Sequence, residues 1–145
     1  MSKTIKAGHV THDIWRSIYR DNDSLKLDGT AKAACEKSAQ IVEAAAAGAD
    51  PVYGVNTGFG KLARIQISTQ DTAKLQRNLI LSHCCGVGEP TPEPIVRLMM
   101  ALKINSLGRG ASGVSWGLIA LLQDMLAKGV TPLVPGQGSV GASGD

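Results

Sequence analysis

Residues 91–108 read TPEPIVRLMMALKINSLG, and this stretch indicates the fold class most directly. Thr91 and Pro92 suit an N-cap and a first helical residue, because proline has a preset φ angle and lacks an amide hydrogen that the first turn leaves unused. Apolar side chains then recur at helical spacing until Gly108 and cover more than one face. The stretch therefore predicts a helix that is buried among other elements.

Four more helices are expected, three before this stretch and one after it. Side-chain spacing predicts helices over residues 11–21 and 69–82, the second opened by a capping box from Ser68 to Asp71. An alanine-rich run over 30–47 and an apolar run that begins at Ser112 or Ser115 and stops at Lys128-Gly129 predict two others. We expect one short strand over 51–55 and a loop over 131–144. The predicted fold class is mainly α.

Composition excludes several classes of protein. The 145 residues are 43% hydrophobic and 19% charged, which excludes a disordered or collagen-like chain. A net charge of +3 with scattered basic residues gives no reason to expect a nucleic-acid partner. No apolar run is long enough to cross a membrane, and the start lacks the apolar core of a signal peptide. We expect a cytoplasmic protein whose cysteines Cys35, Cys84 and Cys85 are reduced thiols with no zinc site.

A tyrosine stands just before a glycine-rich segment, in the sequence YGVNTGFG over residues 53–60. Such a segment can deliver the Tyr53 hydroxyl to a site, where the tyrosine could act as a base. The alternative is a buried tyrosine beside a surface loop. Neither glycine-rich phosphate-binding motif is present.

His83 ends a predicted helix, in the sequence LSHCCGVG over residues 81–88. A histidine there can simply favour the negative end of the helix dipole. The adjacent thiols of Cys84 and Cys85 suggest a metal site instead, but consecutive side chains point to different faces and no further ligands have the needed spacing. A zinc site at His83 is therefore rejected.

The third candidate is the triplet Ala142-Ser143-Gly144, inside GSVGASGD at residues 138–145. Small neighbours allow the glycine nitrogen to approach the carbonyl carbon two residues earlier, and the serine can then lose water to leave a methylidene group. The same triplet occurs at Ala111-Ser112-Gly113. The triplet by itself therefore does not distinguish a reactive turn from a flexible one.

Taken together and in order, YGVNTGFG, the Leu81-Ser82-His83 stretch, KINSL with Arg109-Gly110, and GSVGASGD closely resemble the histidine ammonia-lyases of the aromatic amino acid lyase family. The resemblance covers essentially all 145 residues but only the first third of a family chain. It implies the N-terminal part of an all-helical fold of the aspartase/fumarase-like type, with a short strand and glycine-rich active-site loops. The central helical bundle would begin within residues 1–145 and continue beyond Asp145.

The resemblance also implies roles for particular residues. Ala142, Ser143 and Gly144 would form the 4-methylidene-imidazol-5-one (MIO) prosthetic group, Tyr53 would remove a β-proton, and His83 would bind the substrate. The triplet at Ala111 would be structural. No metal and no dissociable cofactor would be needed.

The implied reaction is the non-oxidative deamination of L-histidine to trans-urocanate and ammonia, the first step of histidine degradation. In relatives that act on phenylalanine or tyrosine, the pair at this position looks like Phe-Leu or His-Leu, whereas the Ser82-His83 of this chain goes with a histidine substrate. The first alternative is a tyrosine or phenylalanine ammonia-lyase or an aminomutase, and the second is a noncatalytic helical interaction module. The whole chain would be a homotetramer with shared active sites, and residues 1–145 alone would be inactive.

Overall fold

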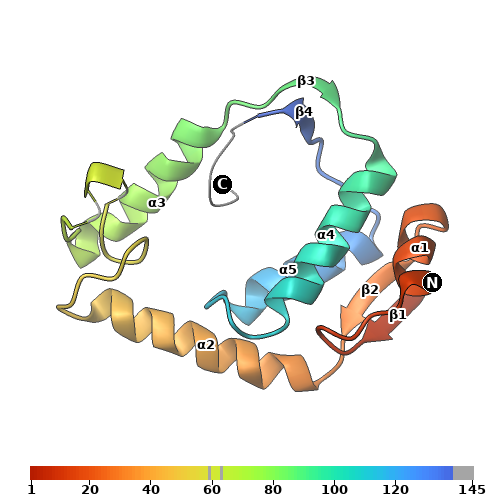
Figure 1. Ribbon diagram of the computed structural model, residues 1–145, viewed down its shortest axis with the longest axis horizontal. Helices are drawn as coiled ribbons and strands as arrows, with labels where there is room; N and C mark the ends of the chain where they lie inside the picture. Colours follow the sequence, from red (N-terminus) through yellow and green to blue (C-terminus); the bar gives the residue numbers. More distant parts are fainter. Residues whose placement is uncertain (59, 63, 139–145) are drawn as a thin grey trace. The chain divides into compact units, whose positions relative to one another are not determined.

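A computed structural model describes residues 1–58, 60–62 and 64–138. Figure 1 shows the order of the elements along the chain. The chain divides into two compact units. Unit 1 comprises Met1–Gln40 and Pro90–Val134, and unit 2 comprises Ile41–Glu89 and Pro135–Asp145.

Unit 1 begins with two short strands joined through a helix. Strands β1 (Ser2–Ile5) and β2 (Ser24–Leu27) pair in parallel, with Ser2 opposite Ser24 and Ile5 opposite Leu27. Helix α1 (His12–Arg20) makes the crossover that a parallel pair requires. The predicted helix over 11–21 is therefore confirmed, with Thr11 as its N-cap.

Two further helices complete the packing of unit 1. Helix α4 (Glu93–Leu107) packs against α1 and against α5 (Trp116–Ala127), which in turn packs on β2. Ser115 is the N-cap of α5 and accepts a hydrogen bond from the amide of Leu118, so the later of the two predicted starts is the observed one. Helix α2 (Thr30–Ala47) begins in unit 1 and continues into unit 2, within the predicted bounds.

The hydrophobic core lies in unit 1. Burial of aliphatic side chains from β1, β2 and four helices is the main stabilising contribution here. Its members are Ile5, Ile18, Leu25, Leu27, Ala31, Cys35, Val96, Met100, Ala101, Ile104, Ile119 and Leu126.

Helix α4 buries one face rather than several. Val96, Met100 and Ile104 recur every four residues and are at most 7% exposed, whereas Met99 and Leu102 are 48% and 44% exposed. The expectation of burial on more than one face is therefore wrong for the described residues. The start also differs by one residue, because Pro92 is the N-cap and Pro94 lies in the first turn.

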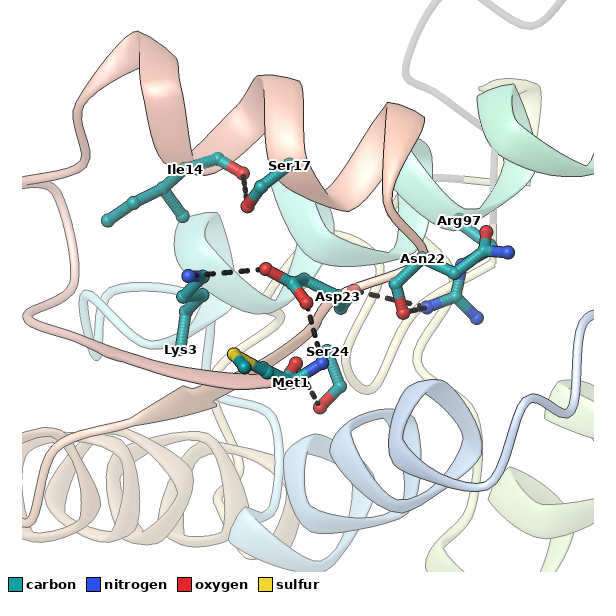
Figure 2. Close-up of polar contacts among 8 residues, drawn as sticks. All are labelled: Met1, Lys3, Ile14, Ser17, Asn22, Asp23, Ser24 and Arg97. Carbon is teal, nitrogen blue, oxygen red and sulfur yellow. Dashed lines mark hydrogen bonds and ion pairs between the residues drawn. The ribbon is translucent and has the colours of Figure 1, made fainter.

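A buried polar cluster joins the start of the chain to α4 (Figure 2). Asp23 accepts a 2.6 Å hydrogen bond from the N-terminal ammonium of Met1 and lies 3.3 Å from Nζ of Lys3. The buried Arg97 donates from Nη2 to the carbonyl oxygens of Asn22 (2.9 Å) and Asp23 (3.1 Å). The hydrogen bond from the Met1 ammonium, with smaller contributions from Lys3 and Ser17, holds the pKa of Asp23 below its ordinary value of 3.8.

Unit 2 contains α3 (Thr69–His83), the short 3-10 helix η1 (Gly60–Leu62), and the paired strands β3 (Val87–Pro90) and β4 (Pro135–Gln137). The predicted helix over 69–82 is confirmed. Ser68 is its N-cap, as predicted: Ser68 Oγ accepts from the Asp71 amide, which is one of the two hydrogen bonds of a capping box, and also donates to the Asp71 carboxylate. Pairing with β3 replaces part of the loop that was expected over 131–144.

The expected strand over 51–55 is wrong. The amides of Val55 and Asn56 both donate to the carbonyl oxygen of Val52, at 3.0 and 3.2 Å, so the chain turns here. Gly54 has a φ of +74°, a left-handed conformation that glycine adopts without steric cost. Tyr53 is therefore on a turn and not on a strand.

Candidate active site

Tyr53 lies on a turn of unit 2 and is 63% exposed. The turn has a buried polar side, because Asn56 and Thr57 are each only 1% exposed. Thr57 Oγ1 accepts from the Gly54 amide at 3.4 Å and donates to the carbonyl oxygen of Gly58 at 3.0 Å. The exposed tyrosine thus lies on a turn in which the Asn56 and Thr57 side chains are buried.

Asn56 is the centre of these contacts. Its Oδ1 accepts from the Val52 amide at 2.7 Å, and its Nδ2 lies within hydrogen-bond distance of three carbonyl oxygens, those of Ala45 (3.1 Å), Gly48 (3.4 Å) and Asp50 (3.0 Å). The last carbonyls of a helix lack partners within the helix. Asn56 therefore caps the end of α2 and ties the Tyr53 turn to it. This role of Asn56 was not predicted, although an asparagine within a glycine-rich segment is typical of such a turn.

The same turn is joined to the residues before α3. The amide of Ile67 donates to the Asn56 carbonyl at 2.8 Å, and that of Gly58 donates to the Ile65 carbonyl at 3.1 Å. Thr57 and Gln66 form an antiparallel bridge. The turn is consequently held between the end of α2 and the start of α3.

His83 is the last residue of α3, as predicted. Its Nδ1 lies 2.7 Å from the Leu79 carbonyl oxygen and 3.1 Å from Ser82 Oγ, which itself donates to that carbonyl at 3.0 Å. Because a carbonyl oxygen can only accept, this contact is a hydrogen bond in the tautomer that carries the proton on Nδ1. In the neutral ring, Nε2 is then the hydrogen-bond acceptor.

Two exposed thiols follow His83 directly. The Cys85 amide donates to the His83 carbonyl at 2.8 Å across Cys84, whose φ of −73° and ψ of 67° are those of an inverse γ-turn. Cys35 is buried in unit 1, and burial raises the pKa of its thiol. In the part of the chain that the structure describes, no group of three or more His, Cys, Asp or Glu side chains could hold a metal ion.

The two predicted side chains of unit 2 lie at different ends of α3. The Tyr53 turn contacts the residues before this helix, whereas His83 ends it, and a helix of 15 residues is about 22 Å long. The structure therefore does not bring Tyr53 and His83 together. A cavity of about 520 Å³ along the start of α3 contains neither of them.

Of the two Ala-Ser-Gly triplets, the structure describes one, Ala111-Ser112-Gly113. Ala142, Ser143 and Gly144 lie outside the described residues. In the other triplet, the amide of Gly113 donates to Ser38 Oγ at 2.8 Å, and Gly113 has a φ of +69°. The nitrogen that cyclisation would use is thus engaged in a hydrogen bond to α2. This contact agrees with a structural role for the triplet at Ala111.

Similar solved structures define the class as helical enzymes that include lyases and aminomutases. The tyrosine aminomutase from Streptomyces globisporus is 29% identical with a TM-score of 0.87, and the alignment covers 96% of this chain and 26% of that protein. Ergothionase from Treponema denticola, an ergothioneine-degrading enzyme, is 28% identical with a TM-score of 0.88, covering 97% and 28%. Histidine ammonia-lyase from Trypanosoma cruzi is 29% identical with a TM-score of 0.83, covering 97% and 27%.

The family model for aromatic amino acid lyases matches residues 10–145, and the chain belongs to this family. The expected family and the mainly helical fold are thereby confirmed. The chain spans between 26% and 28% of the length of these three relatives. Among the described residues, no helix is both long and apolar enough to span a membrane.

Proposed function

We propose that residues 1–145 are the N-terminal part of a histidine ammonia-lyase, which converts L-histidine to trans-urocanate and ammonia as the first step of histidine degradation. The observation that carries this proposal is the Ser82-His83 pair at the end of α3. The 2.7 Å contact of His83 Nδ1 with the Leu79 carbonyl favours the tautomer in which Nε2 is the acceptor. An N–H of the substrate imidazole is a donor that such an acceptor can bind.

Recognition of this kind discriminates between substrates. A phenyl ring has no N–H to donate, so binding phenylalanine would bury polar groups of the site without a partner. In a tyrosine-specific relative we would expect a group suited to a phenol. The polar pair therefore favours histidine over the aromatic substrates.

Tyr53 is proposed as the base that removes a β-proton of the substrate. Its exposure and its position on a turn held by Asn56 support this role. Because Tyr53 and His83 lie at different ends of α3, completing a site around one substrate requires movement of the turn or groups from other subunits. This requirement supports a homotetramer with shared active sites.

Ala142, Ser143 and Gly144 are proposed to be the precursors of the MIO group, which the family uses as an electrophile that makes the substrate amine a better leaving group. Their side chains are the small ones that cyclisation needs, and serine supplies the hydroxyl lost as water. We further propose that the enzyme works in the cytoplasm, where Cys35, Cys84 and Cys85 stay reduced.

Mass spectrometry tests the prosthetic group separately from the substrate. Intact full-length protein is expected to be two water molecules lighter than its sequence mass, because cyclisation and dehydration each release one. Ser143→Ala should restore the full mass and remove the ultraviolet absorbance of the group. Ser112→Ala is the matched control and should retain both. A full-mass wild-type protein would contradict the MIO assignment and favour the noncatalytic helical module.

Substrate selectivity tests the histidine assignment. His83→Leu should lower kcat/KM for histidine by about 100-fold, the order expected when the assembled enzyme encloses the substrate and one substrate hydrogen bond is lost, and should affect phenylalanine less. His12→Leu, at the exposed start of α1, is the control. Equal losses for both substrates would instead favour a tyrosine or phenylalanine lyase or an aminomutase.

A further inference from the structure

Strands β3 and β4 approach each other closely because each of them has a glycine next to the other strand. A methyl group built on Gly136 would lie 3.0 Å from the Glu89 carbonyl oxygen, and one built on Gly88 would lie 3.5 Å from Cγ of Gln137. The Thr91 amide donates to the Val134 carbonyl at 2.8 Å. In these contacts the residue number rises along the first segment while it falls along the second, as in an antiparallel pair.

The tightest of these approaches is at Gly86, directly before β3. A methyl group there would lie 2.8 Å from Cγ, 3.2 Å from Cβ and 3.3 Å from Cδ of Pro135. These separations are shorter than the usual contact of about 3.5–4.0 Å between carbon atoms. The proline ring is stiff, so a side chain at Gly86 would push the two segments apart.

In the sequence, this contact is close to both parts of the chain that carry the proposed chemistry. His83 precedes Gly86 by three residues, and Ala142 follows Gly138 by four. A methyl group on Gly138 would lie 3.9 Å from Cα of Gly86. Because the pair is antiparallel, the chain that leaves β4 starts out beside the segment that leads back to His83.

We infer that Gly86 is a positioning residue: its contact with Pro135 sets where His83 lies relative to the end of β4, which precedes Ala142-Ser143-Gly144 in the sequence. This inference rests on the proposed function. Misplacing a reacting group by about 1 Å can lower a rate by about 100-fold. A side chain at Gly86 should therefore impair turnover while the MIO group still forms, because its precursors lie within one triplet.

The test compares full-length wild type, Gly86→Ala, Gly86→Ala/Pro135→Ala and Gly29→Ala. Gly29 is the matched control, because a methyl group there has no neighbour within 4 Å. Intact mass gives the fraction of each protein that has lost two waters, and kcat/KM for histidine is expressed per dehydrated chain. Gly86→Ala should lower this normalised value by about 100-fold, with the dehydrated fraction and the melting temperature of the wild type. Pro135→Ala, which removes Cγ and Cδ, should restore most of the loss.

Three results would overturn the inference. These are an unchanged normalised activity in Gly86→Ala, a loss accounted for by a lower dehydrated fraction or melting temperature, and a loss that Pro135→Ala does not reduce. A wild-type protein that prefers tyrosine would contradict the proposed function instead. The comparison would then be repeated with tyrosine, and the same three results would decide the role of Gly86.

Discussion

The side-chain amide of Asn56 lies 3.1 Å from the carbonyl oxygen of Ala45 and ties the Tyr53 turn to the last turn of α2. Asn56→Asp should release this turn, because a carboxylate cannot donate to the carbonyls it would face. An unsatisfied buried group costs about 1–3 kcal/mol. We expect faster amide hydrogen exchange at Ile67 and at least a 10-fold lower kcat for histidine, since about 1.4 kcal/mol corresponds to that factor. Asn78→Asp, on the exposed surface of α3, is the control, and an effect of equal size there would contradict the role of Asn56.

The hydroxyl of Tyr53 is expected to be needed for turnover and not for formation of the prosthetic group. Tyr53→Phe removes the group that accepts the substrate proton but keeps the ring. Turnover should fall by 100-fold or more, in the range of about 10²–10⁴ for general-base catalysis, while the two-water mass deficit persists. Tyr19→Phe, at the other tyrosine, should behave as wild type. Undiminished activity in Tyr53→Phe would remove this residue from the mechanism.

The three cysteines should differ in reactivity. Cys84 and Cys85 are exposed, whereas Cys35 is buried and its raised pKa keeps its thiol protonated at neutral pH. A short pulse of iodoacetamide followed by peptide mass analysis should find label on Cys84 and Cys85 first. Cys35 should react only after denaturation. Equally rapid labelling of Cys35 in the folded protein would show that the core of unit 1 is not packed as described.

Acid should loosen the start of unit 1 through Asp23. The pKa of this carboxyl is lowered in the folded state, so its contribution to stability is fully present above the ordinary value of 3.8 and is lost as the pH falls through the folded-state pKa. Asp23→Asn should therefore speed hydrogen exchange in β1 and β2 at neutral pH, with a difference from wild type that shrinks in acid. Asp13→Asn, where the carboxylate is 87% exposed, is the control. A difference that is independent of pH would contradict the ion-pair account.

Local sequence signals predicted the helices well. The N-caps Ser68 and Ser115 both occur as expected, because each accepts a hydrogen bond from an amide only three positions further on. Strands β1 to β4 were not predicted, since each has at most four residues and its pairing partner is distant in sequence. The prediction of a strand at 51–55 was wrong because the chain turns there, with Gly54 in a left-handed conformation.

The candidate site was only partly predictable. Tyr53 and His83 stand in motifs that a reader of the sequence can single out, and the structure places them on a turn and at a helix end. The role of Asn56 depends on carbonyls that become available only where α2 ends, and the approach of Gly86 to Pro135 depends on pairing between distant segments. Such roles follow from three-dimensional contacts, which local periodicity does not encode.

The most direct test of the central proposal is a comparison of kcat/KM for L-histidine, L-tyrosine and L-phenylalanine with the purified full-length protein, with the products identified by mass spectrometry. The acceptor nitrogen of His83 predicts the highest value for histidine, with trans-urocanate and ammonia as products. A higher value for tyrosine or phenylalanine, or a β-amino acid as the main product, would contradict it.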